Sequence, residues 1–210
     1  MKILDLFSGL EGWSSAFRAR GHETVTIDLD YTFNPTYCRN IANIDDLRQF
    51  GDFDVILASP PCENFSVGSL YVHWKDGKPK DAETERSIAL VKHTLGLIEK
   101  ANPKFWVMEN PRGMLRNIIG KPAVEVAYCQ YGLKTMKPTD LWGRLPPSFT
   151  PMTCKNGDPD HVAAPRSSKR GTQAIYDKER GGRHAATRAL IPYDLSLAIC
   201  EACERDMDVK

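Results

Sequence analysis

Cys62 stands in a short segment whose residue types suit nucleophilic catalysis. The segment Ser59–Ser66 reads Ser-Pro-Pro-Cys-Glu-Asn-Phe-Ser and directly follows the apolar run Asp54–Ala58, a predicted buried strand. Pro60 and Pro61 fix the backbone and remove two hydrogen-bond donors, so we expect a stiff turn. A thiolate on such a turn is a soft nucleophile that needs an electropositive, partly hydrated environment. Taken alone, Cys62 is better explained as a small buried hydrophobic residue, so its interpretation depends on its surroundings.

The turn after the first predicted strand could approach a nucleotide. It joins the strand Lys2–Phe7 to a predicted helix, Gly12–Arg20, and Gly9 within it allows the backbone to come close to a ligand. A glycine turn alone is weak evidence, but between a strand and a helix it fits a nucleotide-binding context. Asp28 ends the next predicted strand, Glu23–Asp28, where an acidic side chain can hold ribose hydroxyls.

Alternating strands and helices would place these residues at one edge of a sheet. Phe105–Met108 is predicted to be a buried strand that Glu109-Asn110-Pro111 stops. Ala82–Lys100 is predicted to be a helix with an apolar face made of Ile88, Val91, Leu95 and Ile98. Val124–Tyr128 and Thr139–Trp142 should form a closing pair of strands. The predicted fold class is therefore α/β, a doubly wound, mostly parallel sheet with ligands at the carboxyl ends of its strands.

The chain divides into three segments by composition. Residues 1–142 are expected to form the catalytic core. Residues 143–187 are rich in Pro, Gly, Lys and Arg without periodicity, and we interpret them as an irregular segment that faces the substrate. Residues 188–210 should return to the core as a helix that begins near Pro192 and docks through Leu195, Ile199 and Ala202.

Composition narrows the class of protein. The chain has 210 residues, a net charge of +1 and six cysteines. This length suits one domain, and scattered cysteines favour a reducing cytoplasm over a disulfide framework. No apolar run reaches the roughly 18 residues of a membrane span, and the first residues enter a strand pattern that leaves no room for a signal peptide. The charge argues against massive nonspecific nucleic-acid binding but allows a local basic face.

Three segments together resemble the motifs of the cytosine-5 DNA methyltransferase family. Pro60–Ser66 resembles the family's catalytic motif, Pro-Pro-Cys-Gln-x-Phe-Ser. Asp5–Trp13 resembles its first motif, Asp-Leu-Phe-x-Gly-x-Gly-Gly-Phe. Glu109-Asn110-Pro111 resembles its Glu-Asn-Val signature. They follow the family's order at the ends of successive predicted strands, and the resemblance covers residues 1–142 and the last helix. It implies a Rossmann-like class I methyltransferase that transfers a methyl group from S-adenosyl-L-methionine to carbon 5 of cytosine in DNA.

The resemblance also implies a covalent mechanism. Carbon 5 of cytosine is a poor nucleophile until Cys62 adds to carbon 6 and converts the ring into an enamine. Glu109 would bond N3 and offset the charge that develops there, which requires a proton and a raised pKa; the alternative is a carboxylate placed at a helix start by the dipole. The family's Gln-x-Arg-x-Arg is absent here, so either Lys137 or Thr139 contacts the cytosine O2 or the contact is missing.

The cofactor contacts that the resemblance implies are spread along the chain. Two of these positions differ from the family's pattern, because Asn43 replaces an aspartate and Arg188 replaces an asparagine. Next to Gly12, Glu11 replaces a glycine. The residues expected to bind S-adenosyl-L-methionine are Phe7, Ser8, Gly9, Gly12, Asp28, Asn43, Ile44, Pro60, Arg188 and Ala189.

DNA, most simply a duplex with its cytosine flipped out of the stack, is the expected substrate. Contacts to it are expected from Ser66, Arg112, Arg166, Lys169 and Arg170, and a solvated loop is an equal alternative for the basic segment that holds the last three. The family's recognition region is much reduced here, which suggests a short target or a partner that supplies specificity. The small size suits a phage or mobile element acting in its host's cytoplasm.

Two alternatives to this function stay open. The same chemistry could act on RNA, single-stranded DNA or a cytidine nucleotide, as the short recognition segment allows. The chain could also be an eroded methylase that only binds the cofactor or DNA, although the presence of both Cys62 and Glu109 weighs against this.

The remaining cysteines are expected to pack as ordinary free thiols. Cys200 and Cys203 share one face of the last predicted helix, and Cys154 and His161 could add two ligands to make a zinc site. This spacing matches no standard zinc ribbon or finger, so we predict no metal.

Overall fold

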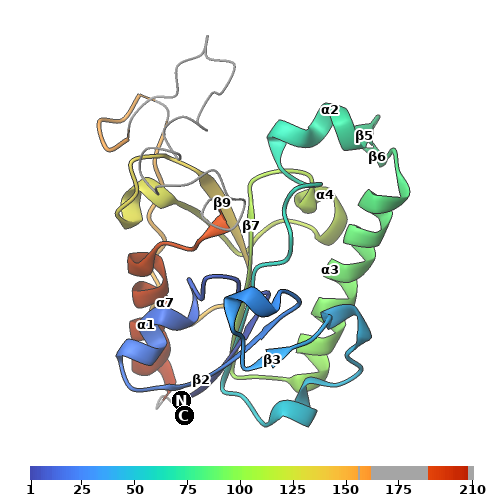
Figure 1. Ribbon diagram of the computed structural model, residues 1–210. Coiled ribbons are helices and arrows are strands. Elements are labelled where there is room, and N and C mark those ends of the chain that lie inside the picture. Colours follow the sequence, from blue (N-terminus) through green and yellow to red (C-terminus); the bar gives the residue numbers. More distant parts are fainter. Residues whose placement is uncertain (156, 162–188, 208–210) are drawn as a thin grey trace.

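Helices cover both faces of a central sheet in the computed structural model, which describes residues 1–155, 157–161 and 189–207 (Figure 1). Within these residues the main sheet has seven strands in the order β3-β2-β1-β4-β7-β9-β8. Their bounds are β1 Lys2–Leu6, β2 Glu23–Asp28, β3 Tyr37–Cys38, β4 Val55–Ala58, β7 Phe105–Pro111, β8 Val124–Ala127 and β9 Pro138–Arg144. The first five in sheet order are parallel, and β9 is antiparallel to both neighbours. The predicted doubly wound, mostly parallel fold is confirmed.

Strand β1 marks the place where the strand order reverses. It pairs with β2 on one side and β4 on the other, so that Leu6 lies opposite both Ile27 and Ala58. In doubly wound sheets, ligands bind in the crevice outside the carboxyl ends of the strands at such a point. The turns that carry Gly9 and Cys62 follow β1 and β4, and the fold therefore brings both turns to this crevice.

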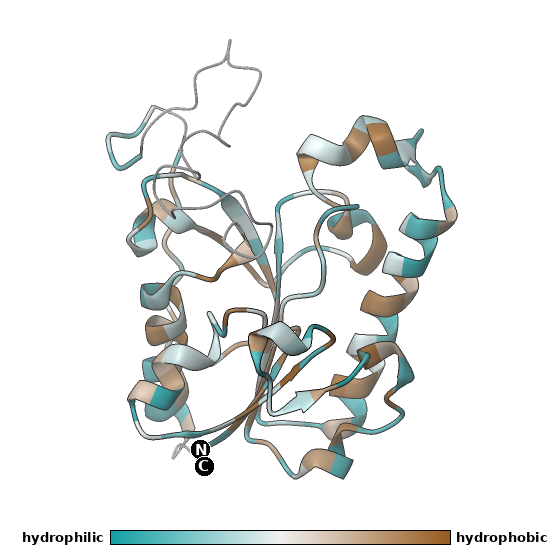
Figure 2. Cartoon of the chain, in the orientation of Figure 1, coloured by the Kyte–Doolittle hydropathy of each residue, from teal (hydrophilic) through white to brown (hydrophobic). Residues whose placement is uncertain are grey.

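Alternating side chains of the central strands build two cores, one on each face of the sheet. Ile3, Val55 and Leu57 belong to the core that includes residues of α1 (Ser14–Ala19) and α7 (Tyr193–Met207). Leu4, Leu6, Ile56 and Ala58 belong to the core that includes residues of α3 (Ala82–Ala101). The helices lie on opposite sides of the sheet in Figure 1, and Figure 2 shows mainly hydrophobic colours along the central strands. The predicted docking residues Leu195, Ile199 and Ala202 are fully buried.

Strand β7 is longer than predicted. It continues through Glu109 and Asn110 to Pro111, since β9 pairs with it along this whole stretch and Pro111 lies opposite Thr139. A proline disfavours the helical region for the residue before it, which is compatible with an extended strand. The expected end at Met108 was therefore wrong, and the extra length carries Glu109 within the sheet.

Several short elements were not predicted. They are a small hairpin of β5 (Trp74–Lys75) and β6 (Lys78–Pro79), the helices α2 (Leu70–His73) and α4 (Leu115–Ile119), and 3₁₀ turns at Tyr31–Phe33, Ile41–Asn43, Leu47–Phe50, Val67–Ser69 and Tyr128–Tyr131. Strand β9 extends two residues past the predicted segment boundary at 142. Among the helices of the described residues, none is both long and apolar enough to cross a membrane.

Two glycines allow backbone segments near the crevice to approach closely. A Cβ atom on Gly113 would lie 2.0 Å from the Phe65 carbonyl oxygen, and one on Gly12 would lie 2.7 Å from the Ile191 nitrogen. Any side chain would force these segments apart. Gly113 thus fixes the loop after β4 against the segment after β7, where Met114 N–H donates to the Phe65 carbonyl (2.8 Å).

Candidate active site

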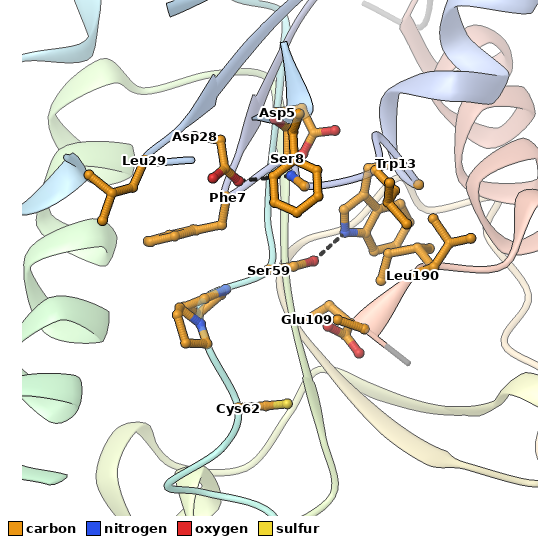
Figure 3. Close-up of a pocket in the computed structure, with 18 of the residues that line it drawn as sticks. Asp5, Phe7, Ser8, Trp13, Asp28, Leu29, Ser59, Cys62, Glu109 and Leu190 are labelled. Carbon is orange, nitrogen blue, oxygen red and sulfur yellow. Dashed lines mark hydrogen bonds between the residues drawn. The ribbon is translucent and has the colours of Figure 1, made fainter. Parts of the chain in front are cut away.

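A cavity of about 790 Å³ opens at the carboxyl ends of the central strands (Figure 3). Its wall is built by the turns after β1, β2 and β4, by the end of β7, and by the segment before α7. It contains most of the residues singled out from the sequence: Phe7, Ser8, Gly9, Gly12, Asp28, Pro60, Cys62, Ser66, Glu109, Lys137 and Ala189.

The loop after β4 holds Cys62 at the edge of this cavity. Ser59 N–H donates to the Leu6 carbonyl (3.2 Å), and the Asn110 amide donates to the Pro60 carbonyl (3.0 Å). The N–H groups of Phe65 and Ser66 both donate to the Cys62 carbonyl (3.0 and 3.1 Å). The expected stiff turn is therefore anchored to β1 and β7 as well as fixed by its prolines.

Glu109 is nearly inaccessible to solvent, with 4% of its surface exposed. Burial raises the pKa of its carboxyl group, against the opposing influence of the Lys137 charge and of hydrogen bonds from Tyr128 and Ser59. The Tyr128 hydroxyl donates to Oε1 (2.8 Å), and the Trp13 indole donates to Ser59 Oγ (2.9 Å). Glu109 thus ends a network of polar groups, of which Figure 3 shows the bond between Trp13 and Ser59. Its raised pKa agrees with the sequence-based expectation of a protonated carboxyl group.

Lys137 brings a positive charge close to Cys62 and Glu109. It is half-buried, lines the cavity and lies over the Tyr128 ring, with Nζ 4.3 Å from the ring centre. Its charge lowers the pKa of Cys62, although burial raises that pKa overall and Glu109 adds to the rise. The backbone of Lys137 has φ of +30°, an unusual conformation for a residue with a side chain.

Thr139, the other residue proposed to replace the family's arginine, does not line the cavity. It is fully buried in β9, and its hydroxyl donates to the Lys137 carbonyl (3.1 Å). A side chain used in this way supports the Lys137 turn. The structure therefore favours Lys137 over Thr139 as the residue that can contact a ligand.

The opposite end of the cavity is formed largely by backbone groups. Asp28 Oδ2 accepts the Gly9 N–H (2.8 Å), and Oδ1 accepts the Asp30 N–H (2.9 Å). Beside them, Asp5 Oδ1 and Ser8 Oγ are buried without a hydrogen-bond partner among the described residues. Burial raises the pKa of Asp5 to about 7. Unpartnered buried polar atoms that line a cavity are groups whose hydrogen bonds a polar ligand could complete.

The adenine-side prediction is displaced by three residues. Asn43 is exposed and Ile44 is buried in the core, and neither lines the cavity. Asn40 and Ile41 lie in its wall instead, because the chain enters the 3₁₀ turn Ile41–Asn43 with Ile41 facing inward. The contact of Asn43 and Ile44 with the cofactor stays a prediction, and the structure places Asn40 and Ile41 in the cavity wall.

The predicted DNA-contacting residues divide into two groups. Ser66 lines the main cavity, and Arg112 is exposed beside a smaller one of about 240 Å³. Arg166, Lys169 and Arg170 lie outside the described residues, and so does the predicted cofactor residue Arg188.

Sequence reasoning missed the residues that position the chemistry. Tyr128, Ser59 and Trp13 hold Glu109 directly or through one another. Leu29 also lines the cavity, although 66% of its surface is exposed. Trp13 lies within a motif, Ser59 directly precedes the Pro60–Ser66 motif and Leu29 directly follows Asp28. Adjacency to predicted site residues was therefore the available signal for these three. Nothing local marked Tyr128.

The strand order β3-β2-β1-β4-β7-β9-β8, in which β9 runs antiparallel to both of its neighbours, is that of a class I methyltransferase fold. The chain belongs to the C-5 cytosine-specific DNA methylase family, whose model matches residues 1–125. The predicted family and enzyme class, a DNA (cytosine-5)-methyltransferase, are confirmed.

Similar proteins include viral and phage enzymes. The chain is 30% identical to the "Probable DNA (cytosine-5)-methyltransferase" of Frog virus 3 across 97% of this chain and 100% of that protein. It is 28% identical to the orphan methyltransferase M.SPRI of Bacillus phage SPR, over 61% of this chain and only 32% of that protein. The fold resembles the Entamoeba histolytica methyltransferase EhMeth, with a TM-score of 0.52 and 15% identity over 74% of this chain and 57% of that one.

Proposed function

We propose that the protein methylates carbon 5 of cytosine in DNA through a covalent bond between Cys62 and carbon 6. The observation that supports this most strongly is the meeting of a thiol, a buried carboxyl group and a cation in the wall of one cavity. The thiol can add to the cytosine ring, the protonated carboxyl group can donate a hydrogen bond to it, and the cation can balance negative charge. The carboxylate and unpartnered polar atoms at the cavity's other end would hold the methyl donor.

Cys62 acts first. Its thiolate forms a bond to carbon 6 of the cytosine, and the electron pair of the C5–C6 double bond moves to make carbon 5 nucleophilic. Burial raises the pKa of Cys62, so the resting side chain is a thiol and must lose its proton before attack. Lys137 is the positive group that favours the thiolate at this point.

Glu109 supports that addition by hydrogen bonding to N3 of the ring. Its raised pKa keeps a proton on the carboxyl group, and that proton offsets the negative charge that the ring gains. Tyr128 and Ser59 fix the carboxyl group, so little reorganisation is needed. Lys137 would donate a hydrogen bond to the exocyclic O2 of the cytosine. After methyl transfer, loss of the proton from carbon 5 restores the double bond and expels Sγ.

The cofactor end fits S-adenosyl-L-methionine, which supplies an electrophilic methyl group on a sulfonium centre. Asp28 lies where a carboxylate can accept hydrogen bonds from ribose hydroxyls. Exposed Leu29 beside it offers an apolar surface for adenine. Asp5 would place a negative charge near the positively charged methionine part, and its unpartnered Oδ1 would gain a hydrogen bond. The turn at Phe7–Gly9 would supply backbone contacts.

Duplex DNA would have to present its cytosine outside the base stack, because Cys62 lies within a cavity. The segment after Ser66 continues into α2, whose Tyr71 and Val72 are 92% and 66% exposed. Figure 2 shows hydrophobic colour on this helix. We propose that this exposed apolar segment faces the DNA at the mouth of the cavity. Arg166, Lys169 and Arg170 are proposed to contact phosphates.

A methylation assay with four matched substrates tests this function. The same cytosine-containing sequence would be offered as duplex DNA, single-stranded DNA, RNA and free cytidine nucleotide. We expect duplex DNA to be methylated fastest, with the product at carbon 5 identified by mass spectrometry of the nucleosides. If RNA or the nucleotide were methylated faster, that molecule and not DNA would be the substrate. No methylation of any of them, despite measurable cofactor binding, would support a non-catalytic binding protein.

A further inference from the structure

Three side chains of types that can bind metal ions lie close together, outside the predicted catalytic motifs. Cys129 lies in the 3₁₀ turn after β8, whereas Cys154 and His161 belong to the segment that follows β9. Their ligand atoms all lie within 4.8 Å of one another, and Cys154 Sγ is 3.1 Å from His161 Nδ1. All three side chains are partly exposed, and none forms a disulfide.

We propose that Cys129, Cys154 and His161 bind a zinc ion. Tetrahedral zinc with bonds of roughly 2.0–2.3 Å holds its ligands roughly 3.3–3.8 Å apart, which is close to the spacing here. Two thiolates and an imidazole suit zinc better than they suit magnesium or calcium, which prefer oxygen ligands. This proposal revises the sequence-based expectation of no metal.

Asp158 lies beside this three-residue cluster, next to Cys154. Its carboxyl group hydrogen-bonds with the Cys154 side chain. A tight turn holds it there, because Oδ2 accepts the Lys155 N–H (2.6 Å) and the Asp158 N–H donates to the Lys155 carbonyl (3.1 Å). Zinc accepts carboxylate oxygen together with sulfur and nitrogen, but Asp158 is not among the residues whose ligand atoms lie within 4.8 Å of one another. Its carboxylate would therefore have to move closer to become the fourth ligand.

The other cysteines considered from the sequence belong elsewhere. Cys200 and Cys203 belong to α7 and are fully buried on the side of that helix that faces the core. A second cluster, His22, Cys200 and Glu204, also has close ligand atoms. Its Glu204 carboxylate is already paired with Arg20, which supplies the positive charge that a metal would bring. We therefore assign the zinc ion to the cluster at Cys129.

The zinc ion would fasten the segment after β9 to the wall that carries the catalytic network. This contact already has a framework, since Ala127 N–H donates to the Met152 carbonyl (3.0 Å) and Gln130 donates to Asp160 (2.8 Å). Cys129 directly follows Tyr128, whose hydroxyl binds Glu109. The inferred metal is thus structural, holding the start of the predicted recognition segment beside the substrate end of the cavity.

Metal analysis of the full chain, purified without chelators under reducing conditions, tests the proposal independently of activity. We expect about one equivalent of zinc per chain. Replacement by Co²⁺ should give a thiolate-to-cobalt charge-transfer band. Cys129→Ser and Cys154→Ser should lose the zinc, whereas Cys38→Ser, at an exposed cysteine outside the cluster, should retain it. His161→Cys, which preserves a ligand, should also retain it, while His161→Ala should not.

Each contrary outcome would overturn the zinc site. Wild-type protein without zinc and without a cobalt spectrum would exclude it, whether or not the variants fold. A disulfide between Cys129 and Cys154 in place of bound metal, detected by mass spectrometry of alkylated protein, would assign the pair to redox chemistry. Zinc that persists in folded Cys129→Ser and Cys154→Ser protein, as judged by circular dichroism, would place the metal at another site.

Discussion

The two ends of the cavity are built in different ways. At the cofactor end, Asp28 accepts two backbone N–H groups, and the wall follows the turn after β1. At the substrate end, the Lys137 charge lowers the pKa of both Cys62 and Glu109, whereas burial raises the pKa of both the thiol and the carboxyl group. The first arrangement is suited to affinity, and the second to changing charge during a reaction.

This difference predicts separable effects of mutation. Substitutions at the substrate end should lower the rate and change its pH dependence while leaving cofactor affinity almost unchanged. Substitutions at the cofactor end should weaken cofactor binding and have less effect on the rate at saturating cofactor.

The largest effect is expected for Cys62→Ser. A serine hydroxyl ionises far less readily than a thiol, so methyl transfer should fall by roughly 10³-fold or more. Calorimetry should show nearly unchanged S-adenosyl-L-methionine affinity, because the turn after β1 is intact. Near-normal transfer by the serine variant would contradict the proposed nucleophile.

The next effect is expected for Glu109→Gln, which keeps the shape of the side chain but cannot supply its acidic proton. The rate should fall by about 10²–10⁴-fold. In wild-type protein, single-turnover rates should rise with pH as Cys62 ionises and then level off as Glu109 loses its proton, since burial raises both pKa values. In the variant the rise should continue until Cys62 is fully ionised. An identical levelling in both proteins would show that Glu109 does not titrate in catalysis.

A smaller effect is expected for Lys137→Met. The Lys137 charge lowers the pKa of both Cys62 and Glu109, so its removal should raise both and move the pH–rate profile to higher pH. The rate near neutral pH should fall by about 10²-fold. Lys137→Arg retains the charge and is the matched control. A profile that shifts equally in both variants would indicate a packing role for the aliphatic chain over Tyr128.

Substitutions at the cofactor end should weaken the binding of S-adenosyl-L-methionine. Asp28→Ala should weaken S-adenosyl-L-methionine binding by about 1.5–3 kcal/mol, the range for hydrogen bonds to a charged group. Asp30→Ala removes a nearby carboxylate that does not line the cavity, so it should change the affinity much less. Isothermal titration calorimetry measures both, and equal affinities for the two variants would place the ribose elsewhere.

The sequence predicted the parts of the site that depend on local signals. Cys62, Glu109 and Asp28 lie at or near the ends of apolar strands, and parallel strands bring such ends to one edge. Their positions in the cavity wall were therefore expected before the structure. The docking face of α7 was predicted for a similar reason, since its apolar residues repeat at helical spacing.

Features that depend on distant contacts were not predictable. The choice of Lys137 over Thr139 follows from the turn before β9, and the length of β7 follows from its pairing with β9. The presence of Asn40 in the cavity wall, where Asn43 was expected to contact the cofactor, depends on how a 3₁₀ turn packs. Cys129 joins Cys154 only because the segment after β9 folds back onto the turn after β8.

The most direct test of the central claim is trapping of the covalent intermediate. Duplex DNA that contains 5-fluorocytosine at the target should form a stable adduct with wild-type protein and S-adenosyl-L-methionine, because the fluorine at carbon 5 cannot leave as a proton. We predict a complex that survives a denaturing gel, whose cross-linked peptide carries the modification on Cys62, and no complex with Cys62→Ser. Absence of the adduct while ordinary DNA of the same sequence is methylated, or attachment through another residue, would contradict the covalent role of Cys62.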